Sequence, residues 1–179
     1  MIPNPDNVSH GRANPDGIAY LYLSTERATA IAEMRPWVGA HVSIAIFEVL
    51  EDLSIVDCSV GHKNLNLSLE APPRDKWNEA VWTDIDRAFS RPIDPNDSPR
   101  IYAATQILAE VFLDSGYDGI AYKSGLGDGQ NLVLFDCKKA SLLSAFIHQV
   151  SKVSYQSSEI APSYGKLSKG EREGPESSA

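Results

Sequence analysis

Hydrophobic and polar positions near the N-terminus predict a turn, a strand and a helix in quick succession. Residues 14–17 read Asn-Pro-Asp-Gly, which is typical of a turn because Pro presets φ and Gly accepts positive φ. The mostly apolar run 18–23 is short enough for a buried strand. Ser24 or Thr25 is a candidate N-cap for a helix whose small and apolar residues recur at helical spacing up to Glu33. A proline three residues later ends that helix.

The next stretch predicts two more strands. Residues 42–50 are apolar at both odd and even positions, so both faces of this strand are expected to be largely buried. Residues 53–56 form a second, shorter strand. Residues 61–75 mix Asn, Ser, Gly and Pro and predict a long loop.

Two longer helices follow. In residues 77–89, Trp77, Val81, Ile85 and Phe89 are spaced four apart, and we expect this stripe to pack in the core. Residues 91–99 contain three prolines and predict a connection that can border a ligand cleft. Residues 101–115 predict a helix with Gly116 after its C-terminus. The packing stripe of that helix is Tyr102, Thr105, Leu108, Ala109 and Phe112.

The C-terminal part predicts three strands. Residues 120–122 form the first, and the glycine-rich run 125–129 separates it from a strand over 130–136. A final strand is expected within 140–155, chiefly over 146–153, after a short helical turn. The glycine run is either an ordinary hairpin or a flexible loop whose backbone N–H groups approach a phosphate.

Composition narrows the class of protein. The 179 residues fit one domain with a sizeable core, and 42% of them are hydrophobic. A net charge of −8 argues against a general nucleic-acid binder. No apolar run is long enough to span a bilayer, and the start lacks a signal-peptide pattern, so the cytoplasm is expected. The two cysteines, Cys58 and Cys137, lack metal-site spacing, so reduced thiols and no metal are expected.

Three chemically distinct side chains are placed close together by the first three elements. Arg12 lies at the turn, Tyr22 near the end of the strand and Glu33 near the end of the helix. A cation, an aromatic face and a carboxylate suit a ligand with phosphates, a flat ring and a sugar. The plain alternative is a surface Arg, a core Tyr and a solvated Glu, and spacing alone favours that alternative because strand–turn–helix units are common.

Four ordered segments resemble a known family. They are Gly-Arg-Ala-Asn-Pro at 11–15, Leu-Tyr-Leu-Ser at 21–24, Ala-Ile-Ala-Glu at 30–33, and residues 117–124, which are followed by Gly-Gln-Asn. In order, spacing and flanking residues they resemble the RES domain, which is named for an Arg, a Glu and a Ser. Those three letters correspond here to Arg12, Glu33 and Ser124, and the resemblance covers about residues 9–155.

The resemblance implies an α+β fold similar to ADP-ribosyltransferases, with mixed sheets around an NAD cleft and peripheral helices. A doubly wound parallel sheet is disfavoured, because no Gly-x-Gly-x-x-Gly turn follows a strand. The domain is expected over 11–155, between an irregular or disordered segment at 1–10 and a disordered tail at 156–179. Relatives usually have more sequence before the Gly-Arg motif, so the resemblance implies an N-terminally short member.

The implied activity is consumption of NAD by cleavage of its nicotinamide–ribose bond. A carboxylate can stabilise the growing oxocarbenium charge on the ribose, and Glu33 is the candidate. Arg12 would clamp phosphate or ribose oxygens with its planar fork. Tyr22 would stack on the nicotinamide ring, with Tyr20 on the same side of the strand as a reserve. Glu26 and Glu48 are competing carboxylates that we rank below Glu33.

Three polar residues have expected supporting roles. Ser124 anchors the ligand and is not a nucleophile, because no Gly-x-Ser-x-Gly elbow surrounds it. Asn131 orients the loop or a ribose hydroxyl, unless it is an ordinary sheet residue. Asn14 fixes Arg12 through an Asx-type turn. His148 is expected to be a satisfied sheet residue.

The acceptor stays open at this point. Water would make the protein an NAD glycohydrolase, inorganic phosphate an NAD phosphorylase, and a protein side chain an ADP-ribosyltransferase. The resemblance implies a toxin of a toxin–antitoxin pair, whose antitoxin often carries a helix-turn-helix domain. The competing hypothesis is a shortened, inactive RES-like module that only binds a partner. No stripe argues for a homodimer, which stays open.

Overall fold

The chain folds into an α+β arrangement with two separate sheets. The computed structural model describes residues 3, 7–61, 72–92 and 99–159. In those ranges a four-stranded mixed sheet has the strand order β1-β5-β4-β3, in which only β3 and β4 run parallel. Its strands are β1 Leu21–Ser24, β5 Gln130–Leu134, β4 Gly119–Lys123 and β3 Ile55–Asp57. This mixed sheet is not a doubly wound parallel sheet, as expected.

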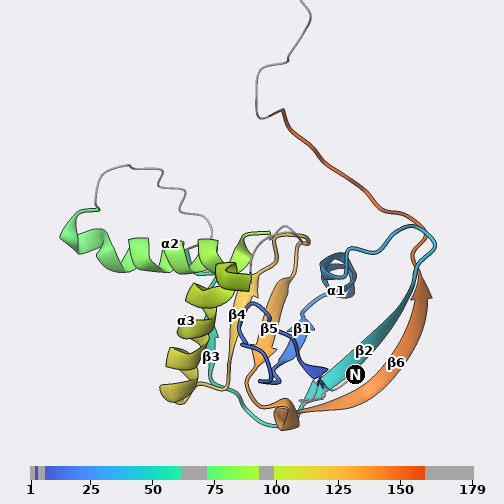
Figure 1. The fold of residues 1–179 in the computed structure, drawn as a ribbon, viewed down its shortest axis with the longest axis horizontal. Coiled ribbons are helices and arrows are strands. Elements are labelled where there is room, and N and C mark those ends of the chain that lie inside the picture. The colour runs from blue at the N-terminus through green and yellow to red at the C-terminus, as the bar shows by residue number, and fades with distance from the viewer. Residues whose placement is uncertain (1–2, 4–6, 62–71, 93–98, 160–179) are drawn as a thin grey trace, which may run out of the picture.

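Two helices cover one side of the four-stranded sheet. The helices α2 (Trp77–Ser90) and α3 (Ala103–Asp114) both contact β4 and each other (Figure 1). Between them and the sheet lies the larger core cluster, which includes Phe89, Ala109 and Ile120. The predicted stripe of α3 and the left-handed Gly116 at its end are confirmed, since Thr105 and Ala109 are buried and Gly116 has φ 86°.

The stripe predicted for α2 is only half right. Phe89 is fully buried and Ile85 packs against the core, whereas Trp77 and Val81 are 56% and 55% exposed. The N-terminal half of α2 extends past the sheet (Figure 1), so within the described ranges its apolar spacing does not meet the sheet there.

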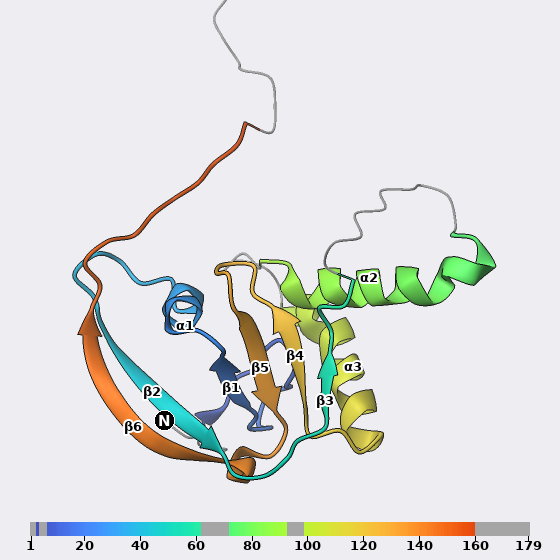
Figure 2. The ribbon, with the colours of Figure 1, turned by 180° about the vertical axis from the view of Figure 1, so that it is seen from behind.

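The other sheet is a curved two-stranded ribbon. Strand β2 (His41–Val49) pairs antiparallel with β6 (Ala140–Gln149), and the register shifts at a bulge between Ile46 and Phe47. Bulges bend strands, and the ribbon arcs around the rest of the molecule (Figure 2). Exposed and half-buried residues alternate along β2, so the prediction of a largely buried strand is wrong. A two-stranded ribbon apart from the main sheet has too few neighbours to bury both faces.

Residue pairing also corrects the final strand. We expected it chiefly over 146–153, but β6 ends at Gln149 because its partner β2 begins at His41, directly opposite. The expected helical turn before it is present as a short 3-10 turn over Cys137–Lys139.

Helix α1 (Arg27–Glu33) contacts both β1 and β2 and so links the two sheets. Neither predicted cap, Ser24 nor Thr25, is its N-cap; Glu26 is, and its side chain makes no capping bond. The Thr25 hydroxyl instead accepts a hydrogen bond from the backbone N–H of Gln130 at 3.0 Å, because β1 and β5 are paired there. The predicted end of this helix is confirmed, one turn before Pro36.

Several predicted segments fall partly outside the described residues. These are most of the long loop over 61–75, the middle of the connection over 91–99 and most of the tail after residue 156. Among the helices of the described part, none is long and apolar enough to cross a membrane.

Candidate active site

A cleft of about 770 Å³ lies between β1, α1 and β2. This volume is in the range of small-molecule and cofactor sites. Strand β2 supplies its apolar wall, while β1, α1 and β5 supply its polar groups. The apolar residues of that wall include Val42, Ile44, Ile46 and Phe47. The polar and aromatic lining residues include Tyr22, Ser24, Thr25, Glu26, Arg27, Glu33, Tyr122 and Asn131.

The carboxylate of Glu33 is held on one of its two oxygens. Oε1 accepts a hydrogen bond from Ser124 Oγ at 2.8 Å and another from Asn131 Nδ2 at 2.6 Å. Among the described residues, none donates to Oε2. Two donors on one oxygen fix the plane of the carboxylate and leave the other oxygen available to a ligand.

Ser124 and Asn131 are themselves held in place. Ser124 Oγ accepts from the backbone N–H groups of Leu126 and Gly127 at 3.0 and 3.1 Å, which directs its own proton to Glu33. Asn131 Oδ1 accepts from Ser24 Oγ at 2.7 Å, which directs its amide N–H toward the carboxylate. Both residues are about 5% exposed, so the two donors are shielded from water, whereas Glu33 itself is exposed.

The glycine-rich loop packs against the protein instead of facing the cleft. The N–H of Gly129 donates to the hydroxyl of buried Thr29 in α1 at 3.0 Å. A Cβ built on Gly127 or Gly129 would lie 2.6 or 2.7 Å from that same hydroxyl oxygen. In the part of the chain that the structure describes, the glycines thus let the loop approach α1, and no residue of the loop lines the cleft.

Tyr22 lines the cleft with its ring and is anchored by its hydroxyl. The hydroxyl donates to Asn14 Oδ1 at 2.8 Å and accepts from the backbone N–H of Ala13 at 2.9 Å. Burial of the hydroxyl raises the pKa of Tyr22 to about 12, so it stays protonated at neutral pH. The residue as a whole is 40% exposed, which leaves much of the ring open to a ligand.

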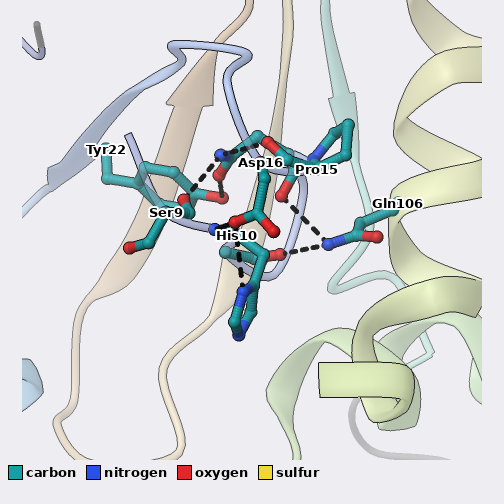
Figure 3. A network of polar contacts seen from close by, with 8 residues as sticks. Ser9, His10, Pro15, Asp16, Tyr22 and Gln106 are labelled. Carbon is teal, nitrogen blue, oxygen red and sulfur yellow. Dashed lines mark hydrogen bonds and ion pairs between the residues drawn. The ribbon is translucent and has the colours of Figure 1, made fainter. Parts of the chain in front are cut away.

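A network of polar contacts ties the N-terminal turn to this tyrosine (Figure 3). The amide of Asn14 donates to the carbonyls of Ser9 and Pro15, each at 3.1 Å, and its oxygen binds Tyr22. The prediction that Asn14 fixes Arg12 through its side chain is therefore wrong. Gln106 of α3 donates to the carbonyls of Gly11 and Asn14, both at 2.9 Å. Sequence reasoning missed Gln106, since no local pattern pairs residues so far apart.

Arg12 lies outside the cleft lining. Its guanidinium donates to the carbonyls of Ala88 at 3.0 Å and Arg91 at 2.8 Å, at the C-terminal end of α2. It also lies over the ring of Tyr122, 5.7 Å from the centroid. Arg12 therefore acts on the cleft indirectly, through the ring of Tyr122 and through its charge near the Tyr22 hydroxyl. Tyr122 in turn neighbours the Glu33 network.

Comparison with protein-family models gives one match for this chain. The family model of the RES domain matches residues 3–157. This chain belongs to the RES domain family. RES domains are typically NAD-utilising enzymes. Comparisons with curated proteins and with solved structures found no match, so likeness to the ADP-ribosyltransferase fold stays a prediction.

Of the three residues that the sequence resemblance matched to the letters of the RES domain, two touch in this structure. Ser124 contacts Glu33 directly, whereas Arg12 belongs to the junction between the N-terminal turn and α2. The structure does not bring Tyr20 to the cleft: it is 5% exposed and packs on Phe135 in the core, with ring centroids 5.0 Å apart. Besides Tyr22, the aromatic residues that line the cleft are Phe47 and Tyr122, and sequence reasoning passed over Tyr122 as part of an apolar strand.

The remaining candidates are the two competing carboxylates and the two cysteines. Glu26 lines the RES-domain cleft, whereas Glu48 is exposed on β2 and does not. Both cysteines are free thiols, and burial raises the pKa of Cys58 to about 12, so this thiol is unreactive. Among the described residues, no group of three or more His, Cys, Asp or Glu side chains is placed to hold a metal ion.

Proposed function

We propose that this RES domain cleaves the bond between nicotinamide and ribose in NAD. The observation that carries the proposal is the state of Glu33, whose carboxylate is held through Oε1 by Ser124 and Asn131 in a cleft. A solvated helix acid would have no such buried donors. Preorganised charge aimed at a reacting centre is a large contribution to enzymatic rate enhancement.

The chemistry needs a fixed negative charge more than an acid. As the C1′–N bond breaks, its electron pair goes to the nicotinamide nitrogen, which becomes neutral and leaves. The positive charge that develops on the ribose is stabilised by Glu33, whose Oε2 can also accept hydrogen bonds from ribose hydroxyls. An acceptor oxygen then bonds to C1′ and releases its proton to solvent.

The aromatic residues of the cleft suit the flat ring of the leaving group. Tyr22 presents its ring to the cleft while its hydroxyl is held by Asn14 and Ala13. A side chain held in advance loses little freedom when a ligand stacks on it, which favours binding. We assign Tyr22 to the nicotinamide ring, with Tyr122 as the neighbouring aromatic wall.

The experiment is nicotinamide release from NAD by the purified protein, with and without inorganic phosphate. Release that needs no phosphate and yields ADP-ribose identifies a glycohydrolase. Release that phosphate accelerates, with a phosphorylated ADP-ribose as product, identifies a phosphorylase. Release only with an added protein that becomes modified identifies an ADP-ribosyltransferase. No release by the folded protein would overturn the proposal and favour the binding module.

We further propose that the physiological result is depletion of NAD, as expected of a toxin in a toxin–antitoxin pair. The cognate partner would be an antitoxin with a helix-turn-helix domain that blocks the cleft beside Glu33. Expression of the gene alone should arrest growth, and expression of a Glu33→Gln variant at the same level should not. Unchanged growth with the unaltered gene would count against a toxin role.

A further inference from the structure

Arg27 is the one cation among the described residues that line the cleft. It is the first residue of α1, and its side chain is exposed to solvent. Its guanidinium makes no hydrogen bond or ion pair with any residue in the described ranges, in contrast to that of Arg12. An unpaired guanidinium at the wall of a cleft has all five of its donors available to an incoming anion.

Arg12 does not fill this role in the structure. Both ends of its planar fork are taken by backbone carbonyls of α2 and the segment after it, and it lies outside the cleft lining. A phosphate placed in the cleft would therefore meet Arg27 and not Arg12. The arginine that the family resemblance points to and the arginine that faces the cleft are different residues.

The other charges of the cleft also favour Arg27 as the group that would meet a phosphate. Its other ionised lining residues are Glu26 and Glu33, both carboxylates. Without Arg27, the charged side chains that line the cleft would all be carboxylates, and like charges at short range oppose the binding of a diphosphate. Arg27 is thus the group that makes the cleft compatible with a phosphate-bearing ligand.

The distance from Arg27 to Glu33 suits a nucleotide. They lie at opposite ends of α1, so their backbones are about 9 Å apart along the helix axis at 1.5 Å per residue. In a nucleotide, only the ribose separates the glycosidic carbon from the phosphate. We propose that Arg27 binds a phosphate of a nucleotide whose glycosidic bond lies at Glu33. This assignment of the substrate's phosphate rests on the proposed function of the cleft.

The test measures equilibrium binding of two ligands that carry no nicotinamide. ADP-ribose carries a diphosphate and adenosine carries none, and calorimetric titration gives the affinity for each. Arg27→Gln should weaken ADP-ribose binding about tenfold or more, as expected for loss of a charge-assisted pair. Adenosine binding should change less than about twofold, because no phosphate is involved. Arg27→Lys should lie between, since it keeps the charge and loses the fork.

Arg87→Gln is the matched control, because Arg87 is an exposed arginine of α2 outside the cleft. It should bind both ligands like the unaltered protein. Unchanged ADP-ribose affinity in Arg27→Gln, an equal loss for adenosine, or no ADP-ribose binding by the unaltered protein would each overturn the assignment. If NAD is cleaved but Arg27→Gln binds normally, the proposed function stands and this inference fails. If NAD is not cleaved but ADP-ribose binding depends on Arg27, the proposed function fails and the phosphate-binding role of Arg27 stands.

Discussion

Ser124 acts at the scale of single hydrogen bonds, by holding a carboxylate in place. Its hydroxyl joins Glu33 to two backbone N–H groups of the glycine-rich loop. We expect Ser124→Ala to lower the kcat for nicotinamide release about tenfold or more, since hydrogen bonds to charged groups contribute about 1.5–3 kcal/mol. KM should change little, because Ser124 does not line the cleft.

Ser115→Ala is a suitable control for this variant. Among the described residues, the Ser115 hydroxyl bonds only the Val111 carbonyl, at the exposed end of α3, so kcat should be unchanged. A Ser124→Ala protein with normal kcat and a raised KM would show that Ser124 contacts the ligand, as we expected from the sequence.

Arg12 is expected to contribute to stability through both of its hydrogen bonds. Arg12→Lys keeps the charge, but an ammonium cannot reproduce the fork that binds two carbonyls. We expect a loss of about 1–2 kcal/mol, which lowers Tm by about 3–6 °C in a chain of this length. Thermal unfolding followed by circular dichroism measures this, with Arg87→Lys as the control. An unchanged Tm together with weakened ADP-ribose binding would assign Arg12 to the phosphate after all.

Residue types and spacing identify which side chains are chemically suited to a site, but not which of their atoms are already bonded. Glu33 and Tyr22 were chosen from sequence, and both line the cleft. Arg12 was chosen on equal grounds, yet its donors are taken by a carbonyl 76 residues away. Arg27 was passed over because an exposed arginine at the start of a helix is common. Only the fold distinguishes the two arginines.

At the scale of elements, the glycine-rich loop packs closely against α1. A Cβ on Gly129 would lie 2.7 Å from Thr29 Oγ1 and 3.0 Å from Thr25 Oγ1. We expect Gly129→Ala to push the loop from α1, lower Tm and weaken nicotinamide release, because Ser124 is carried by the same loop. Adding Thr29→Ala removes the closest contact, so the double variant should lose less Tm than the sum of the two single variants. Strict additivity would contradict this packing.

The elements that the sequence predicts well are those whose neighbours lie close in the chain or whose stripe meets the core. Helix α3 is an example: its buried Thr105 and Ala109 and its terminal Gly116 match the predicted pattern. The start of α1 and the exposure of β2 were mispredicted, because cross-strand pairing with β5 and the isolation of the ribbon decide them. Pairing between distant segments leaves no local signal.

At the scale of the whole molecule, one ion pair links the two sheets. It joins the residue before β6 of the two-stranded sheet to the residue before β4 of the four-stranded sheet. Lys139, just before β6, binds Asp118, just before β4, at 2.7 Å. The hydrogen bond from Lys139, with one from the Ser54 backbone, lowers the pKa of Asp118 below its ordinary value of 3.8. A lowered carboxyl pKa stabilises the fold above the ordinary value, and that stabilisation is lost as pH falls through the lowered one.

The corresponding prediction compares Tm across pH for the unaltered protein and Asp118→Asn. At pH 6 the unaltered protein should unfold at the higher temperature. The difference should shrink as the pH falls from the ordinary aspartate value of 3.8 through the lowered pKa of Asp118, since below that pKa both proteins are neutral at this position. A difference that persists to the lowest pH at which the protein folds would contradict the role of the ion pair.

The cleft itself exists only at this largest scale, because its two walls come from different sheets and α1 links them. An α+β fold with two sheets was predicted from the family resemblance, and the structure has it. The identity of the cleft wall was not predicted, since β2 was expected to be buried. Its half-exposed apolar side chains are those that line the cleft.

The most direct test of the account is nicotinamide release from NAD by three proteins: unaltered, Glu33→Gln and Glu26→Gln. Glutamine keeps the shape of Glu33 but removes its charge, so kcat should fall about a hundredfold or more while NAD affinity is largely kept. Glu26 lines the same cleft, but among the described residues no buried side chain donates a hydrogen bond to its carboxylate. The Glu26→Gln protein should therefore retain most activity. Release by Glu33→Gln at the unaltered rate would contradict the account, as would an equal loss in both variants.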